Sequence, residues 1–461
     1  MPDTISGVKP PLEFIPPNFD AKALWFANRL LPLITRTKTT LRDIDTQNVE
    51  RLVELFQQFQ AGKVRLLLAF RHPSSLDPFC LANLLWRSLP QTAKATGMSL
   101  QRPTHAHFLY DRGIPLWAGN WVTQWAPRLG GIPIHRGKID LNGLKTARDI
   151  FANGKFPLMA APEGATNGPG ISQLGFWCVE DMVKANRNEQ VLIVPIGLQY
   201  HYITPPWEEL RRILTALEKD TGLEIELPAL ASDTREDVLY KRLYRLGEYL
   251  LSVMEAYYTR FFHKTLPAVA IADTSSSSSE TLIPRETFAA RLNGLLDASL
   301  QVAEEFFGVK PRGSIIDRCR RLEQAAWDYI YREDLDLETV SPLDRGLANR
   351  IAEEADIRVW HMRLVESFVA VTGNYVREKP TIERFADTTL LIWDMVCRIK
   401  GGNSFSRPNL GAQRGVITIG EPISVSDRWE AYKGGRKNAK QAVSDLTQDL
   451  QVALEKLIKT D

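Results

Sequence analysis

From Val64 onward, the chain alternates between short apolar runs and longer stretches with the apolar periodicity of helices. The short runs are bounded by turn residues, as buried strands are. Strands are expected at 64–70, 106–110, 131–134, 156–161 and 191–198, and helices at 77–87, 141–153 and 174–185. Because strands that alternate with helices form a sheet covered on both faces, the pattern predicts an α/β fold with a mixed sheet flanked by helices.

Beyond Trp207 the pattern is almost entirely helical, beginning with an apolar stripe from Leu243 to Met254. A serine-rich run at 274–280 is expected to be a linker. Several amphipathic stripes between 288 and 399 then predict a small helical bundle. A strand pattern returns at 416–420 and is followed by a helical pattern at 438–458. This return indicates that an all-helical subdomain is inserted into the α/β domain.

These changes of pattern predict four segments of the chain. We expect an N-terminal helical segment at 1–60, an α/β core at 61–265, a helical insertion with its Ser-rich linker at 266–410, and a returning strand with the C-terminal helix of the core at 411–461. Within the first segment, residues 21–36 have the pattern of a helix that carries arginines beside its leucines. This helix either packs on the core or lies in a membrane interface.

Charge and cysteine content narrow the classes of partner. The 461 residues include 57 Lys and Arg against 55 Asp and Glu, which gives a net charge of +2. Because the two signs of charge are nearly balanced, no basic field extends over the whole protein, and we expect no nucleic-acid partner. Cys80, Cys178, Cys319 and Cys397 are scattered, without a CxxC pair or the spacing of a zinc site. We therefore expect a reducing compartment and no metal.

Membrane insertion is not expected from the sequence. The longest uncharged stretches are too short or too rich in proline to span a bilayer as a helix, and residues 1–17 lack the regions of a signal peptide. We expect a cytoplasmic protein that is soluble or bound to the surface of a membrane. Trp117, Trp121 and Trp125, spaced four apart, form either an interfacial stripe or a core stripe on one helix face.

The first candidate for chemistry follows the strand at 64–70. His72 lies at the end of this strand, and Asp77 follows five residues later, where a helix is expected to begin. A carboxylate beside one imidazole nitrogen fixes the tautomer and stabilises the imidazolium, so that the other nitrogen can take a proton. An isolated His-x4-Asp pattern also arises by chance, and a structural role is the alternative for this pair alone.

Three further segments carry suitable groups in the same order along the chain. Arg136 ends the segment 131–136, and its guanidinium suits a phosphate. Glu163 and Gly164 lie in a glycine-containing loop, whose backbone N–H groups and carboxylate could meet a polar ligand. Pro195 lies in an apolar strand and suits a bend or a pocket wall. Taken singly, these residues could equally be a surface ion-pair partner, a loop acid and an edge-strand proline.

The four segments together resemble the sequence blocks of the glycerolipid acyltransferases, the family that includes lysophosphatidic acid acyltransferase and glycerol-3-phosphate acyltransferase. His72 and Asp77 match its His-x4-Asp motif, residues 131–136 its Ile-Pro-Ile-x-Arg block, 162–164 its Pro-Glu-Gly block and 194–196 its Val-Pro-Ile block. The resemblance covers about 64–198, and 415–425 with the terminal helix resembles the end of such a domain.

The resemblance implies transfer of a fatty acyl group from acyl-CoA or acyl carrier protein to the hydroxyl of a glycerolipid precursor, above all 1-acyl-sn-glycerol-3-phosphate, which would give phosphatidic acid. It implies no cofactor beyond this co-substrate, and no metal. His72 would be the general base and Asp77 would orient it. Arg136 would hold the acceptor phosphate, Glu163 and Gly164 would shape the acceptor site, and Pro195 would lie near the acyl channel.

Two departures from the family pattern leave the acceptor open. Where the Pro-Glu-Gly block often continues Thr-Arg-Ser, this chain has Ala165, Thr166 and Asn167, so the second basic contact to phosphate is missing. The stretch from Thr166 is similar to the Thr-Asn-Gly endings of some lysophospholipid acyltransferases, and this likeness implies a lysophospholipid with a larger head group as an alternative acceptor. Arg71 also stands where an Asn commonly precedes the histidine. The alternatives are transfer to another lysophospholipid or to glycerol-3-phosphate, and a lipid-binding scaffold without catalysis.

Overall fold

The structure, a computed structural model, describes residues 7–115, 119, 121–135, 140–161, 169–223, 234–266, 285–369, 381–404 and 406–458. The chain forms two compact units. The α/β unit comprises Leu12–Ile203 and Ala412–Asp461, and the helical unit comprises Met1–Pro11 and Thr204–Gly411. Each unit is therefore built from two stretches of the chain.

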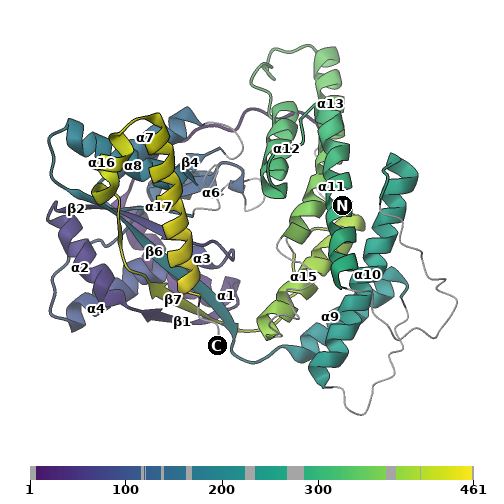
Figure 1. The fold of residues 1–461 in the computed structure, drawn as a ribbon, viewed down its shortest axis with the longest axis horizontal. Coiled ribbons are helices and arrows are strands. Elements are labelled where there is room, and N and C mark those ends of the chain that lie inside the picture. Colours follow the sequence, from purple (N-terminus) through teal and green to yellow (C-terminus); the bar gives the residue numbers. More distant parts are fainter. Residues whose placement is uncertain are drawn as a thin grey trace. The chain divides into compact units, whose positions relative to one another are not determined.

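The α/β unit is organised around one mixed, mostly parallel sheet of eight strands (Figure 1). Along the sheet the order is β1-β7-β6-β2-β5-β3-β4, and the short β8 pairs with β6. Only β7 and β8 run antiparallel to β6, while the other neighbours are parallel. The strands are β1 (Leu41–Gln47), β2 (Val64–Phe70), β3 (His107–Asp111), β4 (Gly131–Ile134), β5 (Leu158–Ala160), β6 (Gln190–Tyr202), β7 (Gln413–Ile419) and β8 (Ile423–Ser424).

Helices cover both faces of this sheet (Figure 1). The alternation of side chains along β2 shows why, because Leu66 and Leu68 pack into one apolar cluster while Leu67 and Ala69 pack into the other. The first cluster includes α2 (Val49–Gln60), α3 (Asp77–Asn83), the π-helical turn Leu84–Ser88 and α4 (Leu89–Ala95). The second includes α7 (Leu141–Asn153), α8 (Pro169–Lys184) and α17 (Arg436–Lys456). The predicted α/β fold with a mixed sheet is thus confirmed.

The N-terminal segment differs from its prediction as an all-helical stretch. It contains α1 (Ala21–Lys38) and α2, but β1 lies between them and pairs with β7 in the sheet. The sequence pattern did not predict β1, because an edge strand with one exposed side carries few apolar residues. Two of its acids, Asp43 and Asp45, lie 3.2 and 3.6 Å from the guanidinium of Arg414 on β7.

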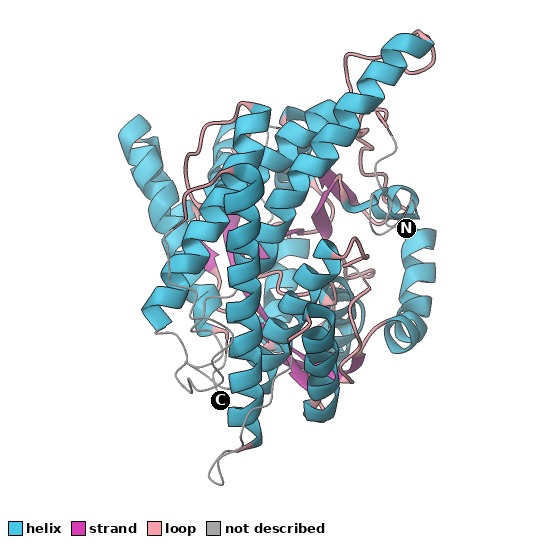
Figure 2. Cartoon of the chain, turned by 90° about the vertical axis from the view of Figure 1, so that its right-hand side faces the viewer, coloured by secondary structure: helices cyan, strands magenta, loops and turns pink. Residues whose placement is uncertain are grey.

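The described part of the helical unit contains α9 (Trp207–Thr221), α10 (Arg235–Phe262), α11 (Arg285–Phe307), α12 (Ile315–Ile330), α13 (Pro342–Val369) and α15 (Ile382–Ile399) (Figure 2). The longer stretch of this unit begins at Thr204. The sequence pattern predicted that the helical insertion begins at residue 266. The reason for the difference is that α9 and α10 pack on helices later in the chain, for example through Trp207 against Phe385, with ring centroids 5.6 Å apart. The Ser-rich run at 274–280 lies outside the described residues.

Among the described helices, none combines the length and the apolar composition that a bilayer crossing requires.

Candidate active site

The site begins where β2 ends. This strand is hydrogen-bonded to β5 on one side and to β6 on the other, and His72 follows its last residue, Phe70, by two positions. Helix α3 begins at Asp77, five residues after His72. Nδ1 of His72 and Oδ2 of Asp77 are 2.5 Å apart. The Asp77 side chain is fully buried, whereas the His72 side chain is 41% exposed. The predicted pairing is therefore present, and it joins an accessible imidazole to a buried carboxylate.

Two further donors hold the carboxylate of Asp77. The backbone N–H of Ser74 donates to Oδ2 at 3.3 Å, and the hydroxyl of Tyr200 on β6 donates to Oδ1. Burial above all, together with the nearby Cys80 and Asp77, raises the pKa of Tyr200, which therefore stays a protonated donor. An ionised carboxylate can only accept, so the Nδ1 of His72 carries hydrogen and donates it to Asp77. This tautomer leaves the lone pair of the imidazole on Nε2.

Cys80, on the first turn of α3, is the nearby group that could compete for a catalytic role. Its thiol is fully buried and lies 3.6 Å from the Tyr200 hydroxyl. Burial raises the pKa of the thiol to about 12, so the sulfur is protonated at neutral pH. Because the thiolate is the nucleophilic form, Cys80 is not an activated nucleophile. The accessible group of this cluster is the imidazole of His72.

Two of the other predicted segments follow strands that end at the same edge of the sheet as β2. Strands β2, β3, β4, β5 and β6 are parallel, so their carboxyl ends meet at one edge, where α/β sheets bind their ligands. His135 follows β4 and is the last described residue before Arg136, and Ala161 follows β5 and is the last described residue before the block at 162–164. The predicted site residues Arg136, Glu163, Gly164 and Thr166 lie outside the described residues.

Pro195 lies in the interior of the sheet, paired with Ala69 of β2, and is buried. The alternative that it is an edge-strand proline is therefore wrong. Its carbonyl accepts a hydrogen bond from the N–H of Gly420 at 2.8 Å, at the point where β7 gives way to β8. A proline is tolerated there because the irregular junction needs no ladder donor. Its predicted place near an acyl channel stays a prediction.

Sequence reasoning missed Tyr200, which is 123 positions from the carboxylate that it holds. The signal lay in the alternation of β6, where Ile196 and Leu198 face the cluster of α3, and Tyr200 packs against the same cluster. Extending the predicted strand by one more alternation would have placed a tyrosine over the start of α3.

Comparison with known proteins returned no relative. No protein-family model matches the chain, and searches of curated proteins and of solved structures found no match. Within the described ranges, no three His, Cys, Asp or Glu side chains gather closely enough to hold a metal ion.

Proposed function

We propose that the protein is an O-acyltransferase, which moves a fatty acyl group from acyl-CoA or acyl carrier protein to a glycerolipid hydroxyl. The first-choice acceptor is 1-acyl-sn-glycerol-3-phosphate, which yields phosphatidic acid. One observation carries the proposal: the accessible imidazole of His72 is bonded to a buried carboxylate, which Tyr200 and Ser74 hold in place. In this proposal the fold is of the glycerolipid acyltransferase type, with an inserted helical subdomain, and the protein works on a membrane surface from the cytoplasmic side.

The proposed chemistry uses His72 twice. A hydroxyl is a poor nucleophile at neutral pH, so Nε2 of His72 takes its proton while the oxygen attacks the thioester carbonyl. The new C–O bond forms, the C–S bond then breaks, and the proton passes from the imidazolium to the leaving sulfur. The products are the ester and the free thiol. Asp77 stabilises the imidazolium through Nδ1–H and stays ionised throughout.

The support around Asp77 favours catalysis over a silent lipid scaffold. Burying a carboxylate without partners is strongly unfavourable, and here three donors offset that cost. A scaffold has no need of a base oriented in this way. Two of the other blocks in the sequence, at 131–136 and 162–164, supply groups for the acceptor, and β4 and β5 end at the same edge of the sheet as β2. In this proposal, Arg136 binds the acceptor phosphate, and Glu163, Gly164 and Thr166 set the choice of head group.

The test is a transfer assay with the full chain. Two donors are tested, acyl-CoA and the acyl thioester of acyl carrier protein, each with a labelled acyl group. Each donor is incubated with 1-acyl-sn-glycerol-3-phosphate, glycerol-3-phosphate and several lysophospholipids. We expect transfer to one class of acceptor, and a rate about 10²–10⁴-fold lower in His72→Ala. His201→Ala is the matched control, because His201 follows Tyr200 on β6 and alternation directs its side chain to the opposite face. This control should keep its activity.

Two results would contradict the proposal in different ways. Lipid binding without transfer to any acceptor would favour the scaffold. Transfer that persists at the full rate in His72→Ala would leave an acyltransferase but remove His72 as its base.

A further inference from the structure

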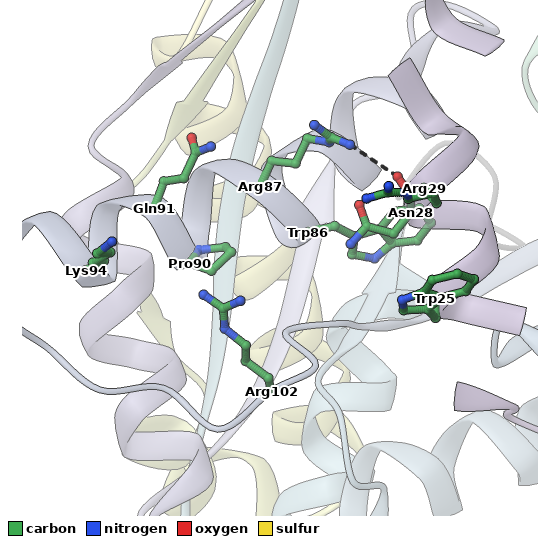
Figure 3. A pocket seen from close by; sticks show the side chains of 9 residues that line it. All are labelled: Trp25, Asn28, Arg29, Trp86, Arg87, Pro90, Gln91, Lys94 and Arg102. Atoms are coloured by element: carbon green, nitrogen blue, oxygen red, sulfur yellow. Dashed lines mark hydrogen bonds between the residues drawn. The ribbon is translucent and has the colours of Figure 1, made fainter. Parts of the chain in front are cut away.

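A basic cavity of about 370 Å³ lies between α1 and the end of the helical run that starts with α3 (Figure 3). Cations and indoles dominate its wall: Arg29, Arg87, Lys94, Arg102, Trp25 and Trp86. All of them belong to the α/β unit. The volume is in the range of small-molecule sites, which leaves room for more than a single ion.

Among the residues that the structure describes, no acidic side chain lines this cavity. The segments that build it, 21–42 and 78–110, contain no Asp or Glu, in a chain that has 55 acidic residues. Within the described part of the chain, Arg29, Lys94 and Arg102 form no ion pair. Like charges that gather around one cavity repel each other, and an anion that enters it relieves that repulsion.

Arg87 shows the same lack of a counter-charge inside the wall. Its Nη2 donates to the backbone carbonyl of Asn28 on α1 at 3.2 Å (Figure 3). Its Nε is buried and has no hydrogen-bond partner among the described residues. The neighbouring Trp86 is held by its indole N–H, which donates to Nδ1 of His105 at 3.1 Å. The wall is therefore ordered, and one of its donors is unsatisfied.

We propose that this cavity binds a phosphate group. Guanidinium groups present planar pairs of donors that match phosphate oxygens, and Lys94 adds a point charge. Three of the four cations are arginines, and the excess positive charge suits a dianion better than a carboxylate. The indoles at the same wall give the organic part of the ligand an apolar surface.

The surface of α1 points to phospholipid as the source of this phosphate. Trp25 is 68% exposed, Phe26 45% and Leu33 61%, although the helix buries Leu24 and Leu31 in the core. The Phe26 ring stacks on Trp125 of α6 (Trp121–Arg128), with the centroids 5.8 Å apart. Exposed apolar residues beside cations are typical of helices that lie in a membrane interface. One face of this helix thus packs on the core, and the membrane interface is the proposed place of the other face.

A second exposed indole is next to this surface. Trp121 begins α6 and is 61% exposed, while Trp117 lies outside the described residues. The predicted indole stripe is thus divided, because Trp125 packs on α1 and Trp121 meets solvent.

This cavity is separate from the site of His72. Trp86 is the first wall residue on the helical run that starts with α3, and it follows Asp77 by nine positions, which at about 1.5 Å per residue places it over 10 Å away along the helical axis. The inference deepens the proposed function by adding a second lipid contact, and it rests on that function only for the nature of the lipid. Its test needs no acyl donor, so it can fail or succeed independently of acyl transfer.

The experiment measures binding of the full chain to vesicles of phosphatidylcholine, with and without phosphatidic acid, and to inorganic phosphate and glycerol phosphate in solution. The cavity variant is Arg29→Gln with Lys94→Gln. The control is Arg36→Gln with Lys38→Gln, which removes the same charge from exposed positions of α1 outside the cavity. Circular dichroism and thermal unfolding check that both variants are folded.

We expect the cavity variant to bind phosphatidic acid vesicles at least about ten-fold more weakly, and the control to stay within about three-fold of the unchanged protein. Binding of the soluble phosphates alone, lost in the cavity variant, would keep the phosphate site and identify a soluble ligand. Equal losses in both variants would show a diffuse basic surface and overturn the proposal. So would the absence of binding in every arm.

Discussion

At the scale of single residues, the candidate site depends on the hydrogen bonds that satisfy the carboxylate of Asp77. A fully buried carboxylate needs several donors, and Asp77 has three, from His72, Ser74 and Tyr200. Two of the three come from the same short loop, and the spacing of His72 and Asp77 made that part predictable from the sequence. The third comes from a strand 123 positions later, and only the folded sheet brings it there.

A buried histidine outside the candidate site gives a prediction for pH. His105 is 3% exposed, accepts from the indole of Trp86 and donates through Nε2 to the carbonyl of Leu129 at 2.8 Å. Burial lowers its pKa to about 4. In the unfolded chain the pKa is about 6.5, so between these values the unfolded state binds the extra proton and stability falls as pH falls. At pH 5 this linkage lowers the free energy of unfolding by about 2 kcal/mol relative to pH 7.

Denaturant unfolding at pH 7 and pH 5 checks this expectation. The His105→Gln variant keeps an acceptor and a donor but does not titrate, so it should lose about 2 kcal/mol less than the unchanged protein over that interval. An equal loss in both proteins would show that His105 does not carry this part of the acid sensitivity.

At the scale of elements, the close approach of α17 to β6 gives a prediction. Cβ of an alanine at Gly197 would lie 2.7 Å from Cβ of Leu457, directly after α17, and 3.2 Å from the Leu457 carbonyl oxygen. The backbone oxygen cannot swing away as a flexible side chain could. We expect Gly197→Ala to lower the free energy of unfolding by about 1–3 kcal/mol, measured by denaturant unfolding.

Gly346 on α13 offers the contrasting position. Nothing lies within 4 Å of a Cβ built there, so Gly346→Ala should be neutral or should stabilise its helix by about 0.5–1 kcal/mol. If Gly197→Ala is as stable as the unchanged protein, α17 does not press against β6 as the structure indicates.

The elements also show where a sequence pattern is sufficient. The runs for β2 and α7 predicted their bounds, because a strand buried on both faces is continuously apolar and a covering helix has one apolar face. The pattern of apolar residues did not predict β1, because the residues of this strand are mostly exposed at the sheet edge. For α3 the predicted helix is present, but a π-helical turn follows at Leu84–Ser88 that no periodicity indicated.

At the scale of the whole molecule, the return of the chain at β7 completes the sheet. This strand lies between β1 and β6, so the sheet needs residues from both sides of the helical unit in the sequence. The strand pattern at 416–420 predicted that return. The boundary near Thr204 could not be predicted in the same way, because α9 has the same amphipathic pattern whether it covers the sheet or packs on α15.

The sequence predicted part of the candidate site, as it predicted part of the fold. The pair of His72 and Asp77 was found because both groups lie within one strand-to-helix connection. The basic cavity was not found, because Arg29 and Lys94 are 65 positions apart and neither belongs to a motif. The roles of Arg136, Glu163, Gly164 and Thr166 stay predictions that acceptor kinetics can test.

The central claim is that His72 acts as the base and that Asp77 acts through it. The most direct test is a double-mutant cycle on the rate of acyl transfer at saturating thioester and acceptor, with His72→Ala, Asp77→Asn and the combination, each checked for folding by circular dichroism. We expect each single change to lower the rate by about 10²–10⁴-fold, and the double variant to be no slower than His72→Ala. Losses that multiply in the double variant, or full activity in His72→Ala, would contradict the account.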